Sequence, residues 1–446
     1  MSTTTTVQVE TPPAVESIEL RHLGPGASTS RRVSAESKEA SHVEAAPHVS
    51  DGHDGGEPPP GALAETERWN RPVKNIGRLA FAFVSFAIAG MNDAAVGALI
   101  PYLEEYYNLS YTVISLIFLT PFVGYSIAAF TNARIHVLLG QRGVAIMAPI
   151  CHLITGFGNG LTDACFCAWV GNMDKANTIQ GFLHSCYSLG ALFSPLIATS
   201  MVVKGGLPWY TFYYLMIGMS GLEFAGLVMV FWDKTGAVYR EEHARENADA
   251  GTAGAGTREA MKSKVTWLCA LFFFAYMGVE VGLGGWVVTF MLRVRHASAY
   301  ASGISGSGFW AGMALGRAVL GFVTERFGER LCLSIYLGIC LGLQLLFWLV
   351  PQFVVSAVAV AFLGFFLGPM FPGAVMVTAK LLPKRIHVSA IGFAMAMGGT
   401  GGTVFPFIIG AIASHKGVSV LQPIILALIA VIAAVWLSFP RIQKRD

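Results

Sequence analysis

Long apolar runs are the feature that most constrains this chain. Beyond residue 78 they recur at lengths near the roughly 20 residues that span about 30 Å of hydrocarbon at 1.5 Å per residue. A strand in lipid would leave its backbone groups without hydrogen bonds, so each run is predicted to be a helix. Eleven runs are predicted, near residues 79–103, 111–133, 143–170, 178–202, 208–232, 265–292, 302–324, 331–350, 353–379, 387–413 and 418–439. The sequence therefore predicts an all-α polytopic membrane protein.

Composition excludes several other classes of protein. Hydrophobic residues make up 54% and charged residues 13% of the 446 positions, and the mean hydropathy is +0.57. That charged share is about half of what a soluble domain carries. No basic stretch is interleaved with aromatic residues, so nucleic acid is not an expected partner. Because no metal-ligand cluster, nucleophile triad or phosphate loop is present, we expect no enzyme, cofactor or metal site.

The chain divides by composition into five parts. Residues 1–75 are predicted to be a disordered cytoplasmic tail, 76–232 an N-terminal helical bundle, 233–264 a cytoplasmic linker, 265–440 a C-terminal six-helix bundle and 441–446 a short cytoplasmic tail. Lys and Arg flank the first span, fill the linker and follow the last span, which favours the cytoplasm for all three. Two arginines precede Ser34, so this serine is a candidate kinase site, with an unmodified tail as the alternative. The plasma membrane and an internal membrane such as the vacuole both remain open.

The two bundles look like repeats of each other, with a gap. Gly181 and Pro195 recur as Gly392 and Pro406 at an offset of 211 (392 minus 181), whereas Gly124 recurs as Gly312 at 188 (312 minus 124). The difference of 23 (211 minus 188) is about one helix and a turn. We therefore predict that 143–170 joins the start of a third helix to the end of a fourth and crosses once, leaving five spans where six are expected.

This gap has a consequence for topology. An odd number of crossings would put the basic N-terminal flank and the basic linker on opposite sides, against the charge rule. We interpret the sequence as a spliced product or a gene-model error. A protein of this form is expected to insert poorly or to transport little.

Five residues that are charged at neutral pH lie inside the predicted spans: Asp93, Asp163, Glu223, Glu280 and Arg317. Each costs about 2.5 to 3.5 kcal/mol at the centre of a membrane helix, so each needs a partner, a proton or a water-filled cavity. Proton or solute binding is the favoured interpretation for Asp93 and Asp163, and it is in balance with a packing role for Glu280. Packing by a hydrogen bond to another helix is favoured for Glu223.

Depth along the helices separates these residues. Asp93 lies 15 residues after Arg78 and Glu280 lies 16 after Lys264, so both are about 22 to 24 Å from the cytoplasmic flank. Arg317 lies eight residues before Glu325, about 12 Å from that edge, so extension to the lipid headgroups is the favoured interpretation and pairing with an acid the alternative.

One histidine belongs with these candidates. His184 lies inside the predicted span 178–202. An imidazole can relay protons near neutral pH, although a lone histidine in a helix is more often a packing residue.

The segment 321–330, Gly-Phe-Val-Thr-Glu-Arg-Phe-Gly-Glu-Arg, links two spans. It resembles the G-x-x-x-[DE]-R-x-G-x-[RK] loop of the major facilitator superfamily, a fold of two pseudo-repeated helical bundles. The resemblance implies a cytoplasmic latch of Gly321, Glu325, Arg326, Gly328 and Arg330. Eleven spans, five and six, would then replace the usual twelve.

Within that superfamily the chain resembles the fucose:proton symporter family. Asn92 and Asp93 followed by Pro101 are similar to its N-D-x-x-x-P region, and residues 158–163 to its G-x-G-x-x-E. Residues 276–280 with Trp286 resemble its Y-x-G-x-E and following Trp, and residues 368–372 its G-P-x-F-P.

The resemblance implies proton coupling or solute binding at Asp93, Asp163, Glu280, Asn92, Asn159 and Trp286. The family has Asn four residues after its fourth-helix acid, whereas this chain has Cys167, which puts fucose itself in doubt.

Together these features favour transport of a small sugar-like solute by alternating access, with proton-coupled symport. Two alternatives remain open. One is a uniporter or efflux carrier of the same fold, and the other is a membrane sensor that signals through its tail without transport.

Overall fold

The computed structural model describes residues 68–151, 156–171, 173–242, 253–383 and 386–440, and within these ranges the regular structure is helical. Ser34, nearly all of the predicted tail 1–75 and the tail 441–446 lie outside the described residues. The elements are α1 (Lys74–Tyr107), α2 (Tyr111–Ser115), η1 (Leu116–Phe118), α3 (Leu119–Cys151), α4 (Phe157–Gly171), α5 (Ala176–Thr199), η2 (Ser200–Lys204), α6 (Thr211–Phe231), α7 (Gly236–Glu242), α9 (Ala253–Lys262), α10 (Lys264–Arg293), α11 (Ala299–Phe327), α12 (Glu329–Leu349), α13 (Phe353–Leu367), α14 (Met370–Leu381), α15 (His387–Lys416), η5 (Val418–Val420) and α16 (Leu421–Leu437).

Eight helical segments of the described chain are long and apolar enough to cross a membrane. They match eight of the predicted runs, while 111–133, 143–170 and 302–324 are not among them. The all-helical polytopic fold is thus confirmed, and the count of eleven spans is not.

The bundle has two ends, which ion pairs identify. At the linker end, where α1 begins and α6 ends, Lys74 and Arg78 bind the two carboxylate oxygens of Asp233 at 3.2 and 2.6 Å. Burial alone would raise the pKa of Asp233, but hydrogen bonds from Arg78 and Lys74 outweigh it and hold this pKa below its usual value. At the opposite end, called the far end below, Arg293 pairs with Glu104 at 3.1 Å.

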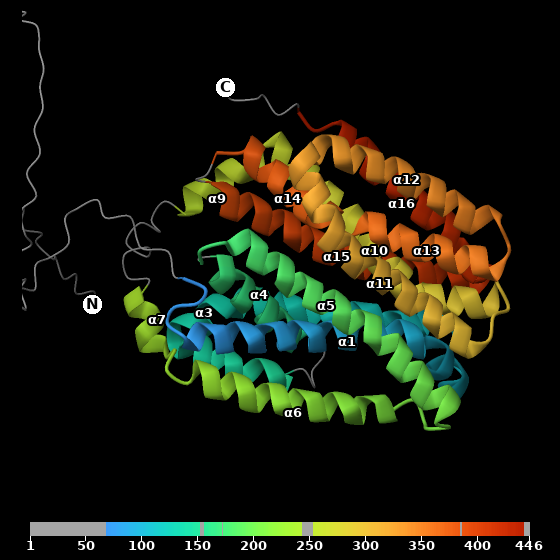
Figure 1. The fold of residues 1–446 in the computed structure, drawn as a ribbon, viewed down its shortest axis with the longest axis horizontal. Helices are drawn as coiled ribbons and strands as arrows, with labels where there is room; N and C mark the ends of the chain where they lie inside the picture. Colours follow the sequence, from blue (N-terminus) through green and yellow to red (C-terminus); the bar gives the residue numbers. More distant parts are fainter. Residues whose placement is uncertain (1–67, 152–155, 172, 243–252, 384–385, 441–446) are drawn as a thin grey trace, which may run out of the picture. The chain divides into compact units, whose positions relative to one another are not determined.

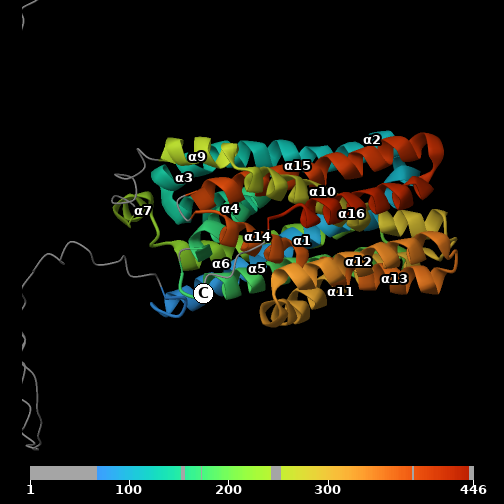
Figure 2. The ribbon, with the colours of Figure 1, turned by 90° about the horizontal axis from the view of Figure 1, so that it is seen from above.

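The helices form two groups, α1 to α6 and α10 to α16, which run roughly along a common direction (Figures 1 and 2). In the first group α1 packs on α5 and α6, and in the second α10 packs on α15 and α16. The contact of α1 with α5 is so close that a Cβ at Gly90 would overlap the backbone of Tyr187, and one at Gly190 would overlap Ala87. These glycines therefore pack helices together at the level of the candidate acids.

The segment 143–170 does not form one crossing. The helix α3 kinks at Gly140, which has φ +69°, and a Cβ there would overlap the backbone of Thr235 at the linker end. From Gln141 to Cys151 the chain rises about 16 Å. Gly156, at φ +95°, then lies against the backbone of Pro121, within the first part of α3. A side chain would be strained at both glycines because φ is positive and the space is filled.

From this level α4 returns to the linker end. In its first turn the amide of Asn159 donates to Asp93 at 3.1 Å, midway along α1. Just beyond its end, Asp174 accepts a hydrogen bond from the Trp69 backbone at 2.6 Å, next to the start of α1. Its 15 residues cover about 22 Å, less than a full hydrocarbon core. The end of α3 and α4 thus make a hairpin that reaches about halfway along α1 and opens toward the linker end.

This hairpin corrects two predictions. The prediction that 143–170 crosses once is wrong, because both flanks of the hairpin lie at the linker end. The prediction that the basic N-terminal flank and the linker lie on opposite sides is also wrong, since Lys74 and Arg78 contact Asp233, the first residue of the predicted linker. The physical reason is that half of a third helix and half of a fourth together make no crossing. The topology therefore gives no reason to expect poor insertion.

Candidate functional site

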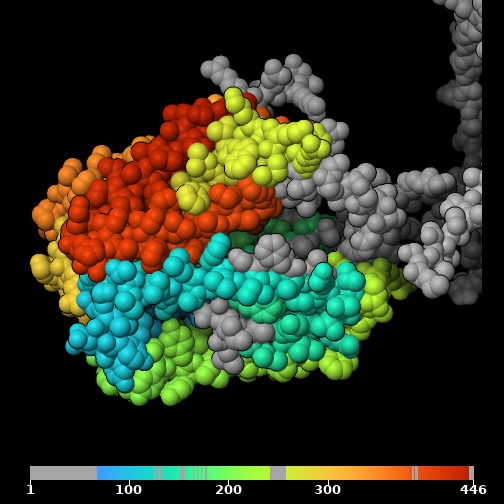
Figure 3. All heavy atoms as spheres, turned by 180° about the vertical axis from the view of Figure 1, so that it is seen from behind, coloured from blue at the N-terminus to red at the C-terminus, as the bar shows by residue number. Residues whose placement is uncertain are grey.

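The two groups of helices touch from the far end to the middle of the bundle. At the far end Glu104 pairs with Arg293, and Lys204 lies 4.0 Å from the ring centroid of Tyr300. Farther along, a Cβ at Gly97 would overlap Gly284. Toward the linker end a hollow separates blue-green from orange atoms, with green atoms at its base (Figure 3). In this conformation the middle of the seam therefore faces the linker end.

Asp93 lies at that middle level with hydrogen-bond donors around its carboxylate. Oδ1 accepts from Asn92 at 3.3 Å and from Asn159 at 3.1 Å, and Oδ2 accepts from the Tyr187 hydroxyl at 2.9 Å. The donors come from α1, α4 and α5, so three helices converge on one carboxylate. The structure thus brings together three of the predicted site residues, Asn92, Asp93 and Asn159.

Asp163 follows Asn159 by one turn of α4, so both lie on one face of that helix. The thiol of Cys167, a further turn on, donates to Asp163 Oδ1 at 3.4 Å. The departure from the fucose-family pattern therefore falls on a side chain that touches the candidate acid. Cys167 also accepts, through its backbone oxygen, a hydrogen bond from Gln180 of α5 at 2.9 Å.

Glu280 and Arg317 form a two-contact ion pair inside the second group. Nη2 of Arg317 lies 3.0 and 3.2 Å from the two carboxylate oxygens, and the side chains are only 4% and 12% exposed. Arg317 Nη1 donates to the hydroxyl of Ser188 on α5 at 2.5 Å. This guanidinium therefore joins α10, α11 and α5, and it spans the seam between the two groups.

That arrangement decides between the two interpretations of Arg317 that the sequence left open. Extension to lipid headgroups is wrong, because the guanidinium points inward to Glu280. Pairing with an acid, the alternative interpretation, is what the structure shows. The pair is favourable because a cation this deep in a bundle needs a counter-charge.

Trp286 lies away from these acids, in the closure of the far end. Its indole N–H donates to the backbone oxygen of Pro406 at 2.9 Å, and its ring contacts Tyr111 and Phe118 of the first group. The side chain is fully buried. In this conformation Trp286 seals the seam and presents no face to a solute.

The remaining candidates lie around the centre. His184 packs its ring against Phe86 of α1 and Phe371 of α14, at centroid distances of 5.6 and 6.0 Å. Glu223 is fully buried on α6, three residues before Gly226, which contacts Phe81 of α1.

Tyr187 and Ser188 were not among the predicted site residues. Both are polar side chains within an apolar helix and lie one turn beyond His184. That spacing could have pointed to them, but their partners depend on how α5 crosses α1 and α11.

The sequence matches the Major Facilitator Superfamily over residues 82–354 and 281–446, which together cover most of the chain. The chain belongs to this superfamily. It is therefore an integral, multi-pass member of a transporter family, as the sequence predicted, and not an enzyme family.

Two proteins are similar to this facilitator in sequence, and two solved structures are similar to it in fold. "Bypass of stop codon protein 6" of Saccharomyces cerevisiae is 29% identical over 411 residues, 81% of this chain and 82% of that protein. The "Glucose/mannose transporter GlcP" of Bacillus subtilis is 21% identical over 393 residues, 83% and 96% of the two chains.

The solved structures share the fold at lower sequence identity. The D-xylose-proton symporter superimposes with a TM-score of 0.64 at 12% identity, covering 83% of this chain and 98% of its own. FucP, the fucose:proton symporter of E. coli, in its outward conformation superimposes with a TM-score of 0.55 at 14% identity, covering 80% and 97%.

The facilitator's predicted latch is only partly assembled. Gly328 turns the chain at φ +91° between α11 and α12, and Arg330 donates to the backbone oxygen of Pro440 at 2.6 Å. Glu325 and Arg326 are exposed and make no ion pair with any residue that the structure describes, and Gly321 has open space around it. The ion pair at this loop is instead Glu329 with Lys380, at 2.6 Å.

Proposed function

We propose that this facilitator carries a small, neutral, sugar-like solute across a membrane by alternating access, in symport with protons. The observation that carries the proposal is the partly buried polar cluster at mid-depth of the seam, where Asp93 gathers donors from three helices and Arg317 joins the two groups. A midplane site between two repeats is where such transporters hold their solute. The names of the B. subtilis relative and of both structural neighbours support a sugar.

In this proposal Asp93 takes up and releases the proton. Asn159 and Tyr187 hold its carboxylate when it is charged, and they are free to turn to solute hydroxyls when it is protonated. Asp163, one turn closer to the linker end on α4, is the second candidate acid and lies on the approach from that end. Asn92 completes the donors to Asp93.

The state described by the structure faces the linker end, and transport requires the far-end contacts to part while the linker end closes. We assign the linker end to the cytoplasm because Lys74, Arg78, Arg330 and Lys380 all lie there. The N- and C-terminal tails, which lie outside the described residues, would then also be cytoplasmic.

Uptake by proteoliposomes tests the proposal. A panel of neutral hexoses and xylose is offered with and without a gradient of one pH unit, acidic outside. Symport of one proton per solute predicts up to about tenfold accumulation, since one pH unit corresponds to about 1.4 kcal/mol. The variant Asp93→Asn should lose this accumulation and keep solute counterflow, while Glu241→Gln, an exposed acid on α7, serves as the matched control.

Each other outcome is informative. Uptake that ignores the pH gradient in the unsubstituted protein would identify a uniporter. Solute binding without flux would support the sensor. Gradient-driven accumulation that survives Asp93→Asn would remove this residue from the coupling mechanism.

A further inference from the structure

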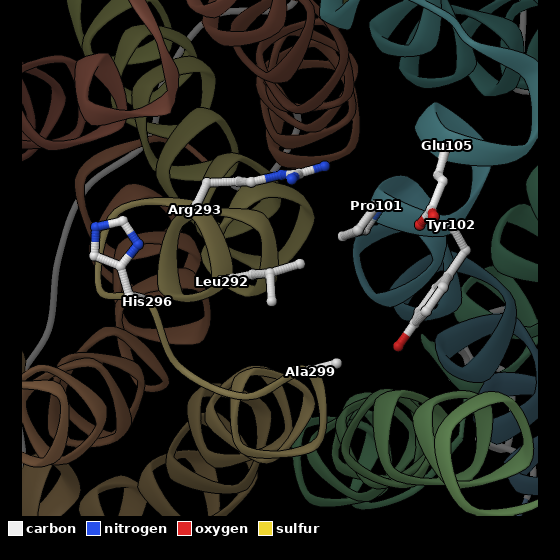
Figure 4. A pocket seen from close by; sticks show the side chains of 7 residues that line it. All are labelled: Pro101, Tyr102, Glu105, Leu292, Arg293, His296 and Ala299. Atoms are coloured by element: carbon white, nitrogen blue, oxygen red, sulfur yellow. The ribbon is translucent and has the colours of Figure 1, made fainter.

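A pocket lies at the far end, on the other side of the closed seam from the polar cluster. It has a volume of about 480 Å³. One wall comes from the end of α1 and the other from the end of α10 and the start of α11 (Figure 4). The lining residues are Pro101, Tyr102, Glu105, Leu292, Arg293, His296 and Ala299.

This pocket and the candidate acid Asp93 lie along the same helix, α1. Pro101 follows Asp93 by eight residues on α1, so the pocket is about 12 Å from the central carboxylate along that helix. The close contact of Gly97 with Gly284 lies between them. In the proposed mechanism, a solute that enters or leaves at the far end would cross the seam beside this pocket.

The two walls offer complementary polar groups. Tyr102 and Glu105 come from α1, and Figure 4 shows Arg293 extending from α10 toward that helix. A carboxylate accepts hydrogen bonds, a guanidinium donates them and a phenol does both. A neutral polyol presents donors and acceptors on every hydroxyl, so it can bridge the walls without bringing a charge of its own. The volume lies in the range of small-molecule pockets.

We propose that this pocket is a second subsite for the neutral polyhydroxylated solute, and this inference rests on the solute class of the proposed function. Because its walls belong to different helix groups, the pocket has this shape only while the far end is closed. A solute bound there favours that closed state over the open one, since a ligand shifts an equilibrium toward the state that it binds better. High solute concentrations on the far side should therefore slow transport.

The test measures protection of a cysteine in the pocket. Ala299→Cys places a thiol on its wall in the purified full-length protein in detergent, and the rate of labelling by a bulky maleimide dye is measured with and without D-glucose. Saturating D-glucose should slow labelling at least fivefold. Adding Glu105→Ala should raise the glucose concentration for half-protection at least fivefold. Ser419→Cys, exposed at the far end outside the pocket, should show no protection.

The possible outcomes separate this inference from the proposed function. Equal labelling rates with and without glucose would overturn the subsite, even if glucose is transported. Loss of protection in Ala299→Cys with Asp93→Ala would also overturn it, because the sugar would then act from the central site. Protection in a protein that transports no hexose would keep the subsite and refute the proposed transport.

Discussion

Breaking the Glu280–Arg317 pair should destabilise the protein in an asymmetric way. Both side chains are almost buried and share two contacts, at 3.0 and 3.2 Å. Removing one partner of such a pair costs about 3–5 kcal/mol, because the other charge is left without compensation. A carboxylate can regain neutrality by binding a proton, whereas a guanidinium stays charged. Glu280→Gln should therefore lower the free energy of unfolding more than Arg317→Gln does.

The double variant Glu280→Gln/Arg317→Gln should recover most of this loss. Two amides can hydrogen-bond to each other, so the double variant is expected within about 2 kcal/mol of the unsubstituted protein, and the coupling energy of the cycle should reach at least about 4 kcal/mol. The measurement is equilibrium unfolding in mixed detergent micelles. The matched control is Glu104→Gln, whose partner Arg293 is 47% exposed, and it should cost about 1 kcal/mol or less.

Additive losses in the double variant would refute this reasoning, since they would mean that the two charges do not depend on each other. Equal losses in the two single variants would refute only the predicted difference between them, which depends on proton uptake by the carboxylate.

Two further predictions concern the fold. Gly190→Ala should lower the free energy of unfolding by at least about 2 kcal/mol, because its Cβ would overlap the backbone of α1, whereas Gly181→Ala, with nothing within 4 Å, should change it little. Equal effects of the two substitutions in the unfolding assay would contradict the close α1–α5 contact. An impermeant maleimide should label Val73→Cys and Lys262→Cys from the same face of sealed vesicles, and Ser298→Cys from the other face. Labelling of the first two variants from opposite faces would disprove the half-depth hairpin.

Hydropathy predicted most helix positions within a few residues. The run 265–292 became α10, Lys264–Arg293, because twenty or more apolar residues in a chain with so few charges have no other stable form in lipid. The same measure failed for 143–170, since a half-depth hairpin is as apolar as a crossing. Gly140 and Gly156 mark its turns, yet their positive φ values are visible only in the structure.

The centre of the candidate site was predicted in part. Asp93 and Asn159 were both expected, and the structure joins them by a hydrogen bond. The partners on α5, Tyr187 and Ser188, could not be assigned because side-chain spacing along one helix does not tell which neighbouring helix it faces. The favoured interpretation of Arg317 was wrong because it used only the depth of Arg317 along its own helix. Its ion-pair partner, Glu280, lies on a different helix, α10.

The hairpin formed by the end of α3 and α4 begins and ends at the linker end, so it leaves the direction of every later helix unchanged. Residues missing from the apex of a helical hairpin are taken from two crossings at once, one outbound and one returning. Such a loss leaves an even number of crossings in the bundle, so every later helix keeps its direction and every later loop stays on its side of the membrane. A loss of the same length within one helix would instead reverse all helices downstream.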